Sequence, residues 1–148
     1  MKKLFPIVAF GLISLLARPI YARDVKYILP IAAAMETSDP EEKPEGTVKF
    51  FFGTDSAPIG VQRLRTDVAD RRTGTYHKSD EKACNDAFLS ALAALEKRAQ
   101  GVGANAVVNI VSYYKNVEMS SATQFECHVG SIRAIVMLRG DSVKIANP

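Results

Sequence analysis

The stretch from Asp80 to Gln100 constrains the fold more than any other part of the sequence. Its apolar side chains recur at steps of three and four residues, the spacing of one face of an α-helix. The apolar positions are Cys84, Phe88, Ala91, Leu92, Leu95, Ala99 and Val102. Ser79 is a suitable N-cap, and Gly101 or Gly103 can end the helix, since glycine adopts the left-handed cap conformation without steric cost. So broad a stripe of alanine and leucine needs a sheet to cover it.

The sheet is expected in the two stretches that follow the helix. Ala106–Tyr114 and Ser131–Arg139 are rich in residues that favour strands. In the second stretch Ile132, Ala134, Val136 and Leu138 would point to one face, while Arg133 and Arg139 mark the other. This alternation indicates an antiparallel sheet with one covered face. The connection Lys115–Gly130 is polar and long for a hairpin.

Two further strands are predicted before the helix. Val25–Ile31 is a short strand whose Pro30 suits an edge or a strand end, because proline has no N–H to donate. Val48–Thr54 is the second strand. Between them, residues from about 32 to 47 lack apolar periodicity and predict a flexible loop. For residues 61–72 the pattern leaves open a short helix or an irregular segment.

These elements follow the order strand, strand, helix, strand, strand. We therefore expect an α+β fold, with a small antiparallel sheet and one long helix packed on one face. The sequence predicts a single domain over residues 23–148, with enough apolar content for a core.

Residues 1–22 have the layout of a secretory signal peptide. Lys2 and Lys3 precede an apolar run from Leu4 to Ala17, and Ala22 is the small residue expected before a cleavage point. The run is shorter than the roughly 20 residues of a membrane-spanning helix. We expect cleavage after Ala22 and export to the periplasm, with an uncleaved anchor as the alternative. No cysteine lies near the cleavage point, so no lipid anchor is expected.

The charge balance argues against a nucleic-acid partner. The chain has 19 basic and 16 acidic residues, and loss of the three basic residues of the leader would leave 16 of each, since 19 − 3 = 16. A nucleic-acid-binding face concentrates positive charge. The best basic stretch, Arg63–Arg72, is interrupted by Asp67 and Asp70 and is better explained as a solvated surface.

The known nucleotide and catalytic motifs are missing or misplaced. Gly101–Ala106 has the G-x-G-x-x-A spacing of a dinucleotide fingerprint, but its glycines end a helix instead of preceding one. The sequence contains no G-x-x-x-x-G-K-[S/T], G-x-S-x-G or H-E-x-x-H. We expect no nucleotide, no cofactor and no enzymatic activity, and we keep an unrecognised hydrolase as the third functional hypothesis.

The two cysteines and two histidines allow two interpretations. A disulfide between Cys84 and Cys127 suits an exported protein, and closing a loop of about 44 residues would stabilise the fold by about 4 kcal/mol. The alternative is a metal site of His77, Cys84, Cys127 and His128, a common zinc ligand set. The sequence lacks the paired spacings C-x-x-C and H-x-x-x-H, which favours the disulfide. A catalytic Cys127–His128 pair is disfavoured, because neighbours on an extended segment point to opposite sides.

Two runs of aromatic residues supply the remaining candidates. Phe50 to Phe52 and Tyr113–Tyr114 are most simply core or edge residues. Since neighbours on a strand face opposite ways, at least one side chain of each run should face solvent or a partner. We expect Phe51 and Tyr113 to be the interface candidates.

The stretch from residue 73 to residue 145 resembles two related groups of small proteins. The word T-G-T-Y, the alanine-rich helix and the word G-A-N-A-V-V-N-I look like the YbjQ-like family of domains labelled as heavy-metal-binding. The same unit, with one cysteine at the helix start and another before the last strand, resembles the periplasmic part of the RcsF-like envelope-stress lipoproteins of enteric bacteria.

The resemblance implies a small sheet with one long helix, and it likens the expected disulfide to one of the bonds of RcsF-like proteins. It also implies self-association, because YbjQ-like domains form rings. RcsF-like proteins have a lipid-bearing cysteine and a second disulfide, and this chain has neither. We expect an exported, non-enzymatic binding or envelope-sensing domain that acts through contacts with an unidentified protein. A small-ligand or metal-binding module is the alternative.

Overall fold

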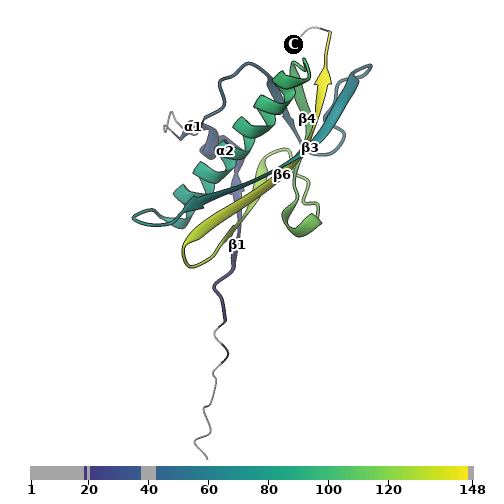
Figure 1. Cartoon of the computed structure of the whole chain (residues 1–148). Helices are drawn as coiled ribbons and strands as arrows, with labels where there is room; N and C mark the ends of the chain where they lie inside the picture. The colour runs from purple at the N-terminus through teal and green to yellow at the C-terminus, as the bar shows by residue number, and fades with distance from the viewer. Residues whose placement is uncertain (1–18, 20, 38–42, 147–148) are drawn as a thin grey trace, which may run out of the picture.

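The computed structural model describes residues 19, 21–37 and 43–146 (Figure 1). The predicted signal peptide therefore lies outside the described residues, apart from Pro19, Tyr21 and Ala22. The elements in chain order are β1 (Val25–Pro30), α1 (Ile31–Glu36), β2 (Lys49–Phe52), β3 (Gln62–Gly74), α2 (Asp80–Gly101), β4 (Ala106–Ser112), the 3-10 turn η1 (Tyr114–Asn116), β5 (Gln124–Val129) and β6 (Arg133–Lys144).

The strands form one curled sheet, and α2 lies across one of its faces (Figure 1). The strand order is β1-β5-β6-β4-β2, and β3 pairs with β6 along the full length of β3. Every pairing is antiparallel except that of β2 with β4, which is parallel. The expected α+β class with one long helix is confirmed. The sheet is larger than predicted, is not purely antiparallel, and its elements follow a different order.

The helix α2 has the limits and caps that its sequence predicts. The side chain of Ser79 accepts a hydrogen bond from the backbone N–H of Lys82 at 3.1 Å, and Gly103 ends the turn with φ +73°. The stripe from Cys84 to Ala99 is buried against β3, β5 and β6. Within the described part of the chain, no helix is long and apolar enough to cross a bilayer.

The first departure from the expected order is α1, which occupies residues predicted to be loop. Ile31 and Ala34 are buried against α2, and they hold this single short helix in place. Six residues are too few to establish a helical period in the sequence, which explains the wrong assignment. Residues 38–42 of the predicted loop lie outside the described residues.

The second departure is β3, a strand of 13 residues where a short helix or an irregular segment was expected. Its charged residues suit an edge strand, which natural sheets protect with charge. Arg98 donates to the carbonyl of Val68, and Arg71 donates to the carbonyl of Asp70 at 2.9 Å. The backbone on this edge is therefore partly occupied by the protein's own side chains.

The third departure is β5, which lies inside the predicted connection between the last two strands. Phe125, Cys127 and Val129 are buried on the helix side of the sheet. The polar residues between them, Glu126 and His128, therefore point to the helix-free side. The sequence did not predict this strand, because only three apolar residues alternate in it and the residues between them are polar.

The core between helix and sheet is tightly packed at two places. Phe88 of α2 stacks on Phe125 of β5 with ring centroids 4.2 Å apart. At Gly140 of β6, a Cβ atom would lie 2.7 Å from a methyl carbon of Val107, too close for two packed carbons. Glycine at this position therefore leaves room for side chains of the neighbouring strand β4 and of α2.

A buried carboxylate of α2 fixes the segment that leads into β2. Glu96 is 2% exposed and accepts the backbone N–H groups of Glu45 at 2.6 Å and Thr47 at 2.7 Å. The hydroxyl of Thr47 donates to the same carboxylate at 2.8 Å. Hydrogen bonds to an ionised group are among the stronger ones in proteins, so Glu96 positions the parallel strand β2.

Candidate functional site

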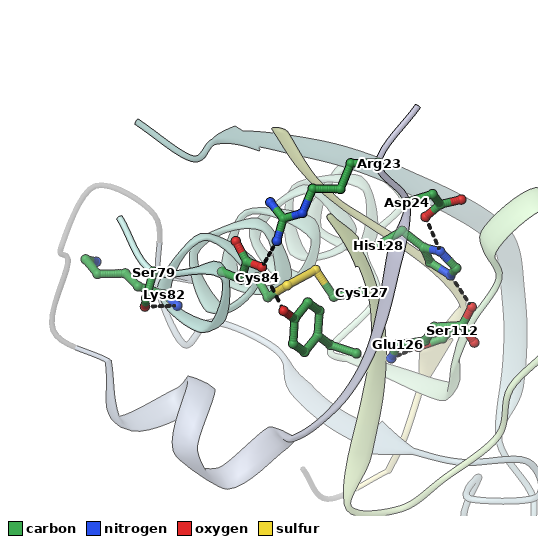
Figure 2. The surroundings of a disulfide bond; sticks show 11 residues. Arg23, Asp24, Ser79, Lys82, Cys84, Ser112, Glu126, Cys127 and His128 are labelled. Carbon is green, nitrogen blue, oxygen red and sulfur yellow. Dashed lines mark hydrogen bonds and ion pairs between the residues drawn. A yellow bond between two sulfur atoms is a disulfide. The ribbon is translucent and has the colours of Figure 1, made fainter. Parts of the chain in front are cut away.

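Cys84 and Cys127 form a disulfide that joins the first turns of α2 to β5 (Figure 2). Their Cα atoms are 5.8 Å apart, and both residues are fully buried. The expected disulfide is confirmed. Burial of both sulfur atoms makes it a structural cross-link, since exchange requires access of an attacking thiolate.

The disulfide removes both thiolates from the alternative metal site. The two remaining candidates have separate surroundings: His77 packs edge-on against Tyr76, whereas His128 contacts Asp24, Glu126 and Tyr114. The four-residue site of two sulfurs and two nitrogens is therefore wrong. Among the residues that the structure describes, no group of three or more His, Cys, Asp and Glu side chains is arranged to hold a metal ion.

His128 is instead the centre of a polar cluster on the helix-free side of β5 (Figure 2). Its Nδ1 lies 3.1 Å from a carboxylate oxygen of Asp24, and its Nε2 contacts the carboxylate of Glu126. The ring stacks on Tyr114 with centroids 3.6 Å apart. Only 12% of the His128 side chain is exposed. His128 is therefore largely enclosed by its contacts with Asp24, Glu126 and Tyr114.

The contacts of His128 limit its chemistry. Each ring nitrogen faces a carboxylate of the protein, Nδ1 that of Asp24 and Nε2 that of Glu126, so both nitrogens are engaged within the fold. The cluster therefore has the form of a structural clamp that ties Asp24, just before β1, to β5.

A second cluster ties the same end of the chain to α2. Arg23 forms an ion pair with Asp80 and donates to the carbonyl of Gly130 at 3.2 Å. The hydroxyl of Tyr27 donates to Asp80 at 2.7 Å. This hydrogen bond, followed by the nearby Arg23 guanidinium, holds the pKa of Asp80 below its ordinary 3.8. The bond to Asp80 also raises the pKa of Tyr27 above 10.0.

The segment from Tyr113 to Ser120, which we name the braced loop, projects from the sheet between β4 and β5. Lys115 and Asn116 adopt left-handed conformations with φ of +50° and +62°, which are unfavourable for residues other than glycine. Next to them, Val117 is 67% exposed. The braced loop therefore holds an apolar side chain in solvent on a strained backbone.

Contacts at the base of the braced loop hold it against the sheet. Ser112 and Met119 exchange backbone hydrogen bonds of 3.0 and 2.8 Å. Glu118 forms an ion pair with Arg139, and the hydroxyls of Ser120 and Thr54 are 2.7 Å apart. These contacts join the braced loop to residues before β4 and in β6.

The structure places the two interface candidates in different environments. Tyr113 is half-buried, and the guanidinium of Arg139 lies 4.4 Å from its ring centroid. Phe51 faces away from α2, opposite to Phe50 and Phe52, as the alternation predicts. It is covered by a small second cluster, in which its neighbours include Ala57 and Val61. Tyr113 therefore lies at the base of the braced loop, whereas Phe51 packs within the domain.

Sequence reasoning missed most partners of His128. Glu126 lies two residues away and would face the same side only if β5 were recognised as a strand. Asp24 lies 104 residues away, and no local pattern connects it to His128. Tyr114 could be found only from the path of the braced loop.

Comparison with known proteins supplies no relative for this chain. No family model matches the sequence, and no curated protein or solved structure is significantly similar to it.

Proposed function

We propose that this protein is an exported, non-enzymatic domain of the periplasm that binds a protein partner through the braced loop. The observation that carries the proposal is the exposure of Val117. This β-branched apolar side chain is 67% exposed within the braced loop, whose base is held by hydrogen bonds and an ion pair. An ordered loop loses less conformational freedom on binding than a flexible one, so its shape favours recognition of a partner.

Export is supported by two features of the described residues. A buried disulfide is typical of proteins that fold in an oxidising compartment. The first contacts of the domain are made by Arg23, whereas Tyr21 is 89% exposed and Ala22 is also exposed. The peptide bond after Ala22 is thus accessible, which agrees with the cleavage point that the sequence predicts.

The non-enzymatic assignment is supported by the contacts of the titratable residues. Both nitrogens of His128 face carboxylates, and both cysteines are in the disulfide. The most buried carboxylates are also engaged: Glu96 binds backbone N–H groups, and Asp86 pairs with Lys78 and Lys82. The side chains of these residues are engaged in contacts within the fold, which leaves them unsuited to bind a substrate.

The resemblance of residues 73–145 to RcsF-like and YbjQ-like proteins agrees with this proposal. It supports a role in sensing at the cell envelope through protein contacts, without the lipid anchor of the RcsF-like proteins. It also supports self-association as one form that the contact takes.

The proposed contact can be tested by crosslinking in intact cells. A photo-crosslinking amino acid replaces Val117, and the matched control carries it at Ile59, which is fully exposed and lies outside the braced loop. We expect a covalent adduct with one partner, or with a second copy of the chain, from position 117 only. Absence of an adduct at this position, or the same adduct from position 59, contradicts the proposal.

Export is tested separately by sequencing the N-terminus of protein recovered from the periplasmic fraction. Arg23 is the expected first residue. Recovery of the intact chain from the membrane fraction would instead support an uncleaved anchor.

A further inference from the structure

Two turns at one end of the domain each carry an exposed, large apolar side chain. Tyr76, in the turn between β3 and α2, is 83% exposed, and Ile132, in the turn between β5 and β6, is 68% exposed. The backbone N–H of Thr75 donates to the carbonyl of Ile132 at 3.1 Å, so the two turns lie side by side. A shallow hollow is lined by residues of both turns. We name Tyr76 and Ile132 the apolar tips.

The polar residues beside the apolar tips include unpaired basic groups. Arg133 follows Ile132 and His77 follows Tyr76, and both are exposed. Within the described part of the chain, neither forms an ion pair. Asp80, at the start of α2, already pairs with Arg23 and accepts the hydroxyl of Tyr27. The end therefore combines protruding apolar groups with basic groups available to an anion.

The N-terminal end of the domain lies at these same turns. Arg23 donates to the carbonyl of Gly130 in the β5–β6 turn and pairs with Asp80 at the start of α2. Only six residue steps separate Arg23 from Ala17, the last residue of the apolar run, and they span at most about 20 Å. While the leader occupies the membrane during export, the apolar tips are therefore held near the bilayer surface.

We infer that the apolar tips dock this end of the domain onto the surface of a lipid bilayer that contains anionic headgroups. Tyrosine favours the membrane–water interface, where its ring meets acyl chains and its hydroxyl meets water. An exposed isoleucine can enter the same boundary, and the guanidinium of Arg133 would lie at the level of the phosphates. This inference goes beyond the proposed protein contact, because it uses different residues and a different kind of partner.

The shape of the surface favours lipid over protein at this end. A specific protein interface typically buries about 800 Å² on each partner and has a packed centre. Here, single side chains project from two turns with a hollow between them, an arrangement suited to insertion into a deformable surface.

The test uses the protein as it is recovered from the periplasm and measures its flotation with vesicles. One set of vesicles contains phosphatidylethanolamine and phosphatidylglycerol in a ratio of about 3 to 1, and the other contains phosphatidylcholine alone. We expect binding to the anionic set that weakens as the salt concentration rises.

The double variant Tyr76→Ser/Ile132→Ser should lower the bound fraction by about tenfold, because both inserted side chains are lost. The matched control Met35→Ser/Ile59→Ser removes two exposed apolar groups elsewhere and should bind like the unmodified protein.

A spectroscopic measurement locates the contact independently. Because the sequence has no tryptophan, the Tyr76→Trp variant carries a single indole. Its emission should shift to the blue with anionic vesicles, whereas that of Ile59→Trp should not. The inference is overturned if neither vesicle is bound, if the control variant loses as much binding as the double variant, or if a crosslinker at position 76 captures a protein while vesicles have no effect. If the crosslinking experiment at position 117 gave no adduct with a partner, the expected vesicle results would be unchanged. The two proposals can therefore be contradicted independently.

Discussion

The carboxylate of Glu96 accepts both the backbone N–H and the hydroxyl of Thr47, a residue 49 positions earlier in the chain. This contact anchors the start of β2 to the middle of α2. Because β2 lies at one end of the described strand order and has β4 as its neighbour there, contacts outside the strand also help to fix its position.

Replacing Glu96 with Gln is therefore expected to destabilise the domain by about 2 to 3 kcal/mol, since an amide nitrogen cannot accept the hydrogen bonds made by the carboxylate. Urea unfolding measures the change. The matched control is Glu81→Gln, an exposed position in the first turn of the same helix, where about 0.5 kcal/mol is expected. Equal losses in the two variants would show that the buried contact with Thr47 contributes nothing specific.

At Gly140, an added methyl group would meet Val107 at 2.7 Å. Gly140→Ala should cost about 1 to 3 kcal/mol, because the overpacked strand must shift away from α2. Gly74→Ala serves as the control, since a Cβ there meets nothing within 4 Å. Thermal unfolding of both variants, followed by circular dichroism, decides the prediction, and a stable Gly140→Ala protein would contradict it.

The buried disulfide makes two measurable predictions. Replacement of both Cys84 and Cys127 by Ala should lower the free energy of unfolding by about 4 kcal/mol on the chain-entropy model. In the unmodified protein, thiol labelling after treatment with a reductant should be slow under native conditions and rapid in denaturant, because both sulfur atoms are buried. Rapid labelling without denaturant would indicate that the region opens readily.

The contact of Tyr27 with Asp80 predicts how stability changes with pH. The pKa of Asp80 in the folded protein lies below 3.8, so the folded state holds a proton there less tightly than the unfolded state. The contribution of Asp80 to the free energy of unfolding is therefore present above pH 3.8. It is lost as the pH falls through the lowered pKa of the folded state. Urea unfolding should show that the free energy of unfolding decreases less between pH 7 and pH 3 in the Asp80→Asn variant than in the unmodified protein.

The same pair acts in the opposite direction at alkaline pH. Because the pKa of Tyr27 is raised in the folded protein, its contribution to the free energy of unfolding is fully present below pH 10.0. This contribution is lost as the pH rises through the raised pKa of the folded state. Tyr27→Phe should remove this alkaline loss. A pH profile identical to that of the unmodified protein would contradict the role of this hydroxyl.

Elements with a clear period could be predicted from the sequence, and elements shaped by distant contacts could not. The helix α2 was recognised because its apolar stripe and both caps are local features. The strand β3 was missed because its charged residues protect an exposed edge and contain little alternation. For α1, burial of Ile31 depends on α2, which lies about 50 residues further along the chain.

The candidate residues follow the same division. Cys84 and Cys127 could be paired because only two cysteines exist, so the choice of partner was fixed. The contact of His128 with Asp24 could not be foreseen, since it requires the register in which Val25 lies opposite Val129. Likewise, the apolar tips are exposed residues on two turns, and their proximity depends on the pairing of β3 with β6.

That register of β1 with β5 also has a consequence for the kinetics of folding. The first strand pairs only with a strand that begins about 100 residues later, so β1 has no partner until most of the chain is present. Pairings this distant in sequence raise the contact order and slow folding, because the intervening chain must be ordered before the pairing forms. Until β5 is present, β1 therefore remains without its strand partner, with its backbone groups open to other chains and to proteases.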